Sequence, residues 1–272
     1  MATVLYNIFN LKALDSTKSA AVLIFILVMA GLLILQRFTR KMFKEKQMEY
    51  ERVKLAYKEK NKLLKDIFTS KNVKYPPKSI FIRVFKEEGI LELWSSSKDK
   101  PYTLVKSYPV SKSSGVLGPK RKEGDKQVPE GFYFIDYFNP LSKYYLSLSI
   151  NYPNESDMIL GYRENPGGDI FIHGGSSTIG CIPINDDGIK ELYIAAVEAV
   201  SQGQDRIEVH IFPKIMDDIG FRELQERHKD DAELLYFWEN IKAGYDAFES
   251  TKTLPVINIG RDGRYIINIK KL

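Results

Sequence analysis

The sequence is poor in cysteine and histidine: its 272 residues include one cysteine, Cys181, and three histidines. A single cysteine excludes an internal disulfide. It also excludes a structural zinc site built on paired Cys and His, because such sites need four ligands. No second thiol exists in the chain to trap Cys181 as a disulfide in an oxidising compartment. The disulfide-stapled and zinc-binding classes are therefore excluded, and the thiol of Cys181 stays free for chemistry.

Positive charge is lacking on the part of the chain that has a globular composition. The whole chain has a formal net charge of +5, but residues 37–65 alone carry eleven Lys and Arg against four Glu. Residues 66–272 are left with a net charge of −3. Domains that bind nucleic acid cluster basic side chains on the folded part. This distribution therefore argues against a nucleic-acid partner.

Residues 20–35 lack any charged or strongly polar side chain. As a helix they span roughly 24 Å, slightly less than the hydrocarbon core of about 30 Å. No small-residue cleavage site lies before the basic residues that follow. The segment is therefore predicted to be an uncleaved, single-pass anchor in the cytoplasmic membrane, with a buried helix as the alternative. The excess of Lys and Arg after residue 36 would by itself place the C-terminal part in the cytoplasm.

Residues 37–75 lack glycine and proline and are rich in charge, which predicts a helical stalk. Pro76 and Pro77 end this pattern, since proline disfavours helix at its own position and at the one before it. Three parts are predicted: residues 1–36 with the anchor, residues 37–75 as the charged stalk, and residues 76–272 as a globular domain.

The globular part begins with short segments rich in β-branched and aromatic residues, separated by turn signals such as Glu88-Gly89. Strands are predicted over 79–85, 90–94, 102–110, 132–137, 144–150, 170–172, 206–212 and 265–269, and helices over 185–200, 217–228 and 231–248. This order predicts an α+β domain with a mostly β core and flanking helices.

Residues 111–131 are too long and too rich in Gly, Pro and charge for a simple hairpin. They predict either an excursion of the sheet or one wall of a substrate groove. Their five Lys and Arg would make such a wall basic.

The stretch DIFIHGGSSTIGCIPINDD, residues 169–187, holds Cys181 and, eight positions upstream, His173. A short strand would deliver His173 onto a two-glycine loop, and the chain would then return to Cys181. A thiolate beside an imidazole is the simplest cysteine nucleophile, and the backbone N–H groups of Gly180 and Cys181 could hold an oxyanion. The alternative is an ordinary buried cysteine and a structural histidine. His210 and His228 are predicted to be structural or solvent-facing.

Three segments carry a resemblance to a known family. They are HGGSSTIGC with the helix that follows from residue 187, YPVSKSSGVLGPKRKEGDKQVPEGFYFID at 108–136, and FWENIKAGYDAFE at 237–249. They resemble YkuD-type L,D-transpeptidases, most closely the YafK-type murein-processing branch, over about residues 75–268. The resemblance implies that Cys181 is the nucleophile, that His173 is the general base, and that the carbonyl of Gly174 orients the imidazole.

The segment departs from the commoner family pattern, which reads Ser-His-Gly-Cys and has Arg or Asn two residues later. Here Thr178 and Ile179 precede Gly180 and Cys181, and Pro183 stands two residues later. The second histidine and the Arg or Asn are therefore missing. The YafK-type branch shares the short spacing between His and Cys, so these departures are interpreted as features of the branch.

The resemblance implies acyl transfer on peptidoglycan stem peptides through a thioester on Cys181, with hydrolytic release of murein-attached groups favoured. The alternatives are a transpeptidase that cross-links stems or attaches protein to murein, and an anchored cell-wall binding module without turnover. No metal and no other cofactor is implied, and the sequence does not indicate an oligomeric state. Because peptidoglycan lies outside the cytoplasmic membrane, the domain from residue 76 is expected in the periplasm, with the membrane as a second partner.

Overall fold

The computed structural model describes residues 16–97 and 100–269. These residues divide into two compact units between residues 42 and 43. The first unit consists of most of α2 (Ser16–Gln47), whose last turn belongs to the second unit. Within α2 the apolar side chains of residues 22–29 are exposed, Phe25 to 66%. Among the helices that the structure describes, none is both long enough and apolar enough to cross a membrane. The anchor predicted over residues 20–35 therefore has no support from the structure.

The second unit is built on an eight-stranded, curled sheet of order β3-β2-β1-β8-β4-β5-β6-β7. Strands β1 and β8 pair in parallel, as do β6 and β7, and the other neighbours are antiparallel. The strands are β1 (Ser79–Phe85), β2 (Ile90–Ser96), β3 (Thr103–Pro109), β4 (Gly131–Asn139), β5 (Ser147–Ile150), β6 (Phe171–His173), β7 (Ile182–Pro183) and β8 (Glu208–Phe212), and a separate pair consists of β9 (Val256–Ile259) and β10 (Tyr265–Asn268).

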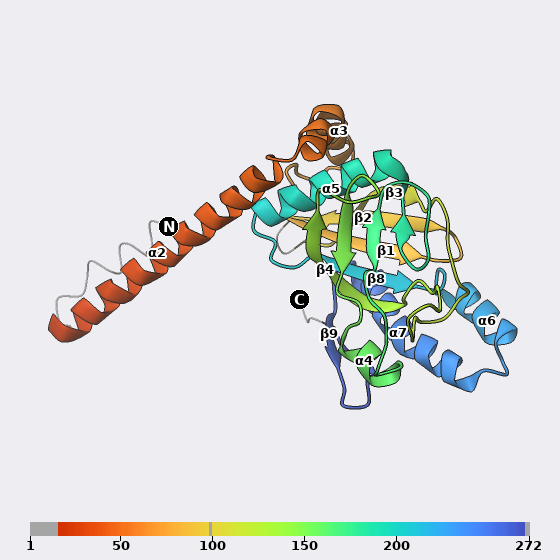
Figure 1. Cartoon of the computed structure of the whole chain (residues 1–272). Coiled ribbons are helices and arrows are strands. Elements are labelled where there is room, and N and C mark those ends of the chain that lie inside the picture. The colour runs from red at the N-terminus through yellow and green to blue at the C-terminus, as the bar shows by residue number, and fades with distance from the viewer. Residues whose placement is uncertain (1–15, 98–99, 270–272) are drawn as a thin grey trace. The chain divides into compact units, whose positions relative to one another are not determined.

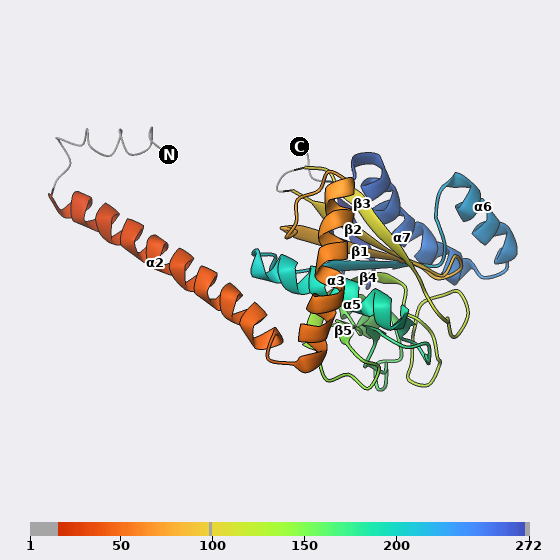
Figure 2. The same cartoon turned by 90° about the horizontal axis from the view of Figure 1, so that it is seen from above.

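Helices cover both faces of this sheet (Figures 1 and 2). The helices of the second unit after α2 are α3 (Glu51–Ser70), α4 (Glu155–Leu160), α5 (Asn185–Ser201), α6 (Asp218–Arg227) and α7 (Ala232–Thr251). Side chains alternate across β1: Ile80 and Ile82 join the cluster that contains α3 and α5, whereas Phe85 joins the cluster of α6 and α7. The sheet core with flanking helices agrees with the predicted fold class.

The stalk prediction is wrong for α3, which is part of the core of the second unit. Val53, Ala56, Leu64 and Phe68 are fully buried and belong to the same cluster as the buried face of α5. Their spacing of three, eight and four residues places them on one face of the helix, while the charged residues occupy the other. The domain boundary predicted at residue 76 therefore lies near residue 42.

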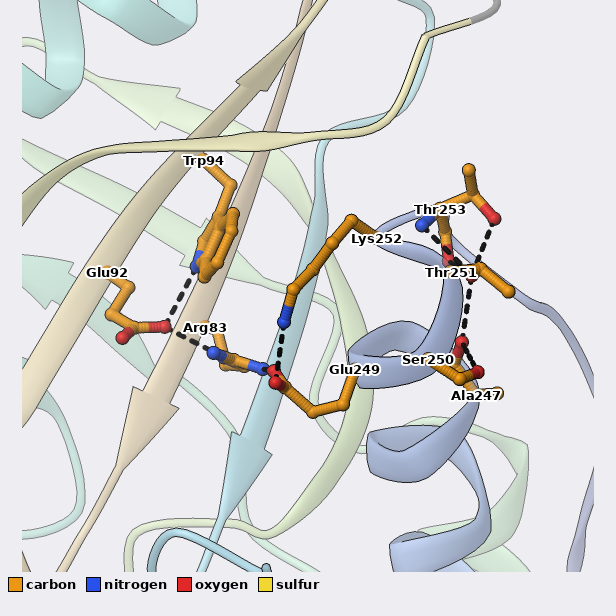
Figure 3. A network of polar contacts seen from close by, with 9 residues as sticks. All are labelled: Arg83, Glu92, Trp94, Ala247, Glu249, Ser250, Thr251, Lys252 and Thr253. Atoms are coloured by element: carbon orange, nitrogen blue, oxygen red, sulfur yellow. Dashed lines mark hydrogen bonds and ion pairs between the residues drawn. The ribbon is translucent and has the colours of Figure 1, made fainter. Parts of the chain in front are cut away.

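A buried arginine ties α7 to the sheet (Figure 3). Arg83 on β1 donates from Nε to Glu92 on β2 at 2.8 Å and from Nη1 to Glu249 on α7 at 2.5 Å. Its guanidinium also lies 5.0 Å from the ring centroid of Trp94. Because Arg83 is only 5% exposed, these partners compensate for the loss of its hydration.

Most predicted elements are present, with two kinds of difference. β5 begins at Ser147 and not at residue 144, because Tyr145 has a φ of +75°, which breaks an extended strand. The short elements α4, β7 and β9 were not predicted, because two to six residues carry too little periodicity to be recognised.

The packing of α3 gives a testable prediction. A chain that starts at residue 43 should unfold at the same denaturant concentration as the full chain, whereas a chain that starts at residue 76 should be less stable. Losing the buried side chains of Val53, Leu64 and Phe68 should cost about 5–9 kcal/mol, comparable to the whole stability of a typical domain. Circular dichroism during urea unfolding measures both, and equal midpoints for the two truncated chains would contradict the assignment of α3 to the core.

Candidate active site

Strand pairing brings the two predicted site residues to one place. β6 lies between β5 and β7, with Ser147 opposite His173 and Ile172 level with Ile182. Cys181 immediately precedes β7, so the parallel register places it level with Phe171. Since residues 171 and 173 of a strand share one face, His173 and Cys181 lie on the same side of the sheet.

Both side chains line a cavity of about 410 Å³. One wall comes from the turn between β4 and β5 together with the start of β5, and the other from the segment of residues 169–181. The lining residues are Asn139, Ser142, Lys143, Tyr144, Ser147, Asp169, Phe171, His173, Ser177, Thr178, Ile179 and Cys181.

The imidazole of His173 is fixed in tautomer and in orientation. Its Nδ1 lies 2.5 Å from the carbonyl oxygen of Gly174. A carbonyl oxygen only accepts hydrogen bonds, so Nδ1 carries the proton and Nε2 presents a lone pair. Nε2 is buried and has no hydrogen-bond partner within the described part of the chain. The ring of Tyr144 stacks on the imidazole, with centroids 4.5 Å apart and planes at 26°.

Burial favours the uncharged forms of both His173 and Cys181. It lowers the pKa of His173, with the hydrogen bond to Gly174 opposing the shift, and it raises the pKa of the Cys181 thiol, with a backbone hydrogen bond from Phe171 opposing. The Sγ atom lies 3.4 Å from the carbonyl oxygen of Asp169. At neutral pH the cavity is therefore lined by a protonated thiol and a neutral imidazole.

The glycine loop after His173 has no space for a side chain at Gly174. A Cβ there would lie 2.5 Å from Oδ1 of Asp186 and 2.6 Å from the carbonyl oxygen of Tyr144. The same Oδ1 accepts a hydrogen bond from the N–H of Gly175 at 2.9 Å. Asp186, in the first turn of α5, thus holds the loop, and Asn185 caps the helix by accepting from the N–H of Gly188.

A threonine hydroxyl closes the loop that carries Cys181. Oγ1 of Thr178 donates to the carbonyl oxygen of Cys181 at 2.7 Å and accepts from the N–H of Gly180 at 3.1 Å. The N–H of Gly180, predicted as an oxyanion donor, is therefore already engaged. It can reach an oxyanion only when the hydrogen bond to Thr178 breaks.

Residues 111–131 do not form a wall of this cavity: none of them lines it, although the structure describes them all. They lie behind the loop of Cys181, since a Cβ on Gly180 would meet the carbonyl oxygen of Gln127 at 3.0 Å. Lys120 pairs with Asp125 at 2.7 Å instead of facing a substrate. The structure therefore favours the interpretation as an excursion of the sheet.

A buried ion pair anchors this excursion to β1 and α7. Nζ of Lys86 donates to Oε1 of Glu130 at 2.8 Å and to the carbonyl oxygens of Gly118 and Val128. Oε2 of Glu130 accepts from the indole of Trp238 at 2.7 Å. Positive charge at the cavity comes from Lys143 instead, which is the one Lys or Arg among the described residues that line it.

The other two histidines lie away from the site, in agreement with their predicted roles. His210 is 1% exposed and packs edge-on between Phe81 and Phe132, with centroids at 4.6 and 4.8 Å. His228 lies against Trp238 at 4.9 Å.

Four residues of the site were not identified from the sequence: Lys143, Tyr144, Thr178 and Asp186. Tyr144 was placed in a strand, and no local pattern links it to His173, 29 residues away. Thr178 and Asp186 flank the glycine loop, where short polar side chains commonly bond to backbone groups. The presence of such short polar side chains beside two glycines is the sequence pattern that could have identified Thr178 and Asp186.

The site can be compared with known proteins. The family model for YkuD, the L,D-transpeptidase catalytic domain, matches residues 79–209. The chain is 37% identical over 191 residues to the protein named "Putative L,D-transpeptidase YafK" of Escherichia coli K12, covering 70% of this chain and 74% of that one, and the same values hold for its counterpart in Escherichia coli O157:H7. The helical cell shape determining protein Pgp2 of Campylobacter jejuni aligns with a TM-score of 0.41 at 20% identity, over 69% of this chain and 74% of that one.

The family model and the relative in Escherichia coli confirm the resemblance seen in the sequence. The family model spans both His173 and Cys181, and the relative is similar over more than two thirds of both chains. The chain therefore belongs to the L,D-transpeptidase family.

Proposed function

We propose that the protein is a cysteine acyltransferase that acts on peptidoglycan stem peptides, with Cys181 as nucleophile and His173 as general base. The observation that carries the proposal is the hydrogen bond between Nδ1 of His173 and the carbonyl of Gly174. It leaves the lone pair of Nε2 unpaired in a cavity that Cys181 also lines. The resting thiol and neutral imidazole are the protonation states that such a reaction starts from.

In the proposed mechanism, Nε2 of His173 takes the thiol proton as Sγ of Cys181 attacks the carbonyl carbon of the stem peptide. The carbonyl of Gly174 accepts from Nδ1–H and stabilises the imidazolium. The tetrahedral intermediate collapses to a thioester, and the amine that leaves takes the proton from Nε2. The N–H of Cys181, joined by that of Gly180 once released from Thr178, would stabilise the oxyanion.

The thioester then reacts with water or with an amine. We propose that water is the main acceptor, so that the enzyme releases groups attached to murein. The support for this choice is the similarity to the YafK-type branch, which is associated with hydrolytic release. Transpeptidation uses the same acyl-enzyme and would replace only the second step.

We further propose that the catalytic domain works outside the cytoplasmic membrane, in the periplasm. The argument is the place of the substrate, since peptidoglycan stems are outside that membrane. The positive-inside tendency of the residues after position 36 opposes this orientation, but it is a bias that other signals override.

The first prediction concerns the catalytic pair. Cys181→Ser and His173→Ala should each lower turnover of muropeptides by about 10⁴-fold or more while the fold is kept, and His228→Ala should leave turnover within a few-fold of that of the unaltered chain.

The pH dependence should follow His173, because a protonated imidazole cannot accept the thiol proton. As the pH is lowered, kcat/KM should begin to decrease only below about 6.5, the ordinary histidine pKa. Mass spectrometry of muropeptides measures turnover. Substantial turnover by Cys181→Ala would end the nucleophile assignment, and absence of both turnover and a covalent adduct with a carbapenem in the unaltered chain would favour a binding module.

The second prediction concerns the acceptor. When the full chain is given murein-attached peptide in one reaction, and free donor stem with an amine acceptor in another, released peptide should form faster than cross-linked product. Mass spectrometry distinguishes the two, because cross-linking joins the masses of donor and acceptor whereas hydrolysis adds one water. Faster cross-linking would replace hydrolysis by transpeptidation and leave the role of Cys181 unchanged.

The third prediction concerns location. A reporter that is active only after export, fused to the C-terminus at residue 272, should be active in growing cells. A reporter that is active only in the cytoplasm, fused at the same position, serves as the control and should be silent. The reverse pattern would exclude the periplasmic location and, with it, a peptidoglycan substrate.

A further inference from the structure

The turn of residues 142–145, between β4 and β5, forms one wall of the catalytic cavity. Ser142, Lys143 and Tyr144 line the cavity, and the ring of Tyr144 stacks on His173. The carbonyl oxygen of Tyr144 also lies against Gly174, whose own carbonyl fixes the imidazole. Whatever holds this turn therefore also holds the imidazole of His173.

The turn needs an external restraint, because its backbone is strained. Tyr145 adopts a φ of +75°, a left-handed conformation that is unfavourable for a bulky side chain and persists where the surrounding structure enforces it. No glycine lies between residues 139 and 146 to relieve this strain.

The restraint comes from α3, about ninety residues earlier in the chain. Nη1 of Arg52 donates to the carbonyl oxygen of Ser142 at 2.5 Å and to that of Tyr145 at 2.8 Å. The guanidinium also lies 5.7 Å from the ring centroid of Tyr145. One cation thus binds the turn at both ends, and such hydrogen bonds are stronger than those between neutral groups.

Arg52 is itself held by a rigid element. Its neighbour Val53 and, one turn on, Ala56 are fully buried in the main core. The guanidinium therefore extends from a helix that is fixed to the domain. α3 lies outside residues 79–209, the part that the family model matches.

We propose that Arg52 is a positioning residue of the active site: it fixes the turn of residues 142–145, so that Tyr144 stays stacked on His173 and the imidazole keeps its orientation. Arg52 does not line the cavity and touches no reacting atom. The effect on turnover rests on the proposed function, whereas the effect on His173 can be measured without it.

The test uses the three histidines of the full chain as reporters. Stacking on Tyr144 shifts the ring signals of His173 in a ¹H–¹³C NMR spectrum, and Tyr144→Leu gives their position without the stack. Arg52→Met, which keeps the apolar stem, and Arg52→Ala should both move the His173 signals towards that position. The signals of His210, buried in the core, should stay in place and show that the fold is intact.

Lys62→Ala is the matched control. It removes one positive charge from the same helix, but Lys62 pairs with Asp66 at 2.8 Å within α3 and does not contact the turn. It should leave the His173 signals and turnover unchanged. The Arg52 variants should lose about 10- to 100-fold in kcat, as expected for a misplaced catalytic group, with a smaller change in KM.

The outcomes separate the two proposals. His173 signals that coincide with those of the unaltered chain in a folded Arg52 variant would overturn the positioning role, whatever the turnover. Unfolding of both Arg52 variants, with Lys62→Ala folded, would overturn it in favour of a purely structural role. If the signals move but the unaltered chain turns over no muropeptide, the positioning role stands and the proposed function fails.

Discussion

The parallel pairing of β6 with β7 is the constraint on which the site depends. Parallel neighbours usually need a long crossover, most often a helix, but here the residues between the two strands form only a loop. So short a return is possible because Gly175 and Gly180 adopt positive φ angles and because Asp186 and Thr178 bond to the loop backbone. The cavity, the orientation of His173 and the start of α5 all follow from this return.

Much of the fold was predictable because its central elements are buried on both sides. β1 has the predicted bounds, since six of its seven residues are buried and Arg83 alone interrupts its β-branched and aromatic residues from Ile80 to Phe85. α3 was recognised as a helix but assigned to a stalk, because its charged residues outnumber the four that it buries. Of the apolar residues in α3, Val53 faces the core but Leu63 is 42% exposed. The lack of glycine and proline predicted the helix, but not the surface against which it packs.

The site was predictable where its residues are close in sequence and unpredictable where they are not. His173, Gly174 and Cys181 lie within nine residues, so a motif can carry them. Tyr144 and Arg52 reach the same place through tertiary packing, and neither belongs to a pattern that local reasoning can detect. The engaged N–H of Gly180 could not be foreseen either, because it depends on the rotamer of Thr178.

Burial of Cys181 has a consequence for its chemical durability. Oxidants such as peroxides attack the thiolate and not the thiol. Because burial raises the pKa of Cys181, the thiolate is scarce until His173 accepts the proton. The sulfur is therefore less readily oxidised to sulfenic and sulfinic acids while the thiol keeps its proton. The chain has no second thiol that could trap an oxidised Cys181 as a disulfide. The low ionisation of the thiol therefore limits the oxidation of its one cysteine.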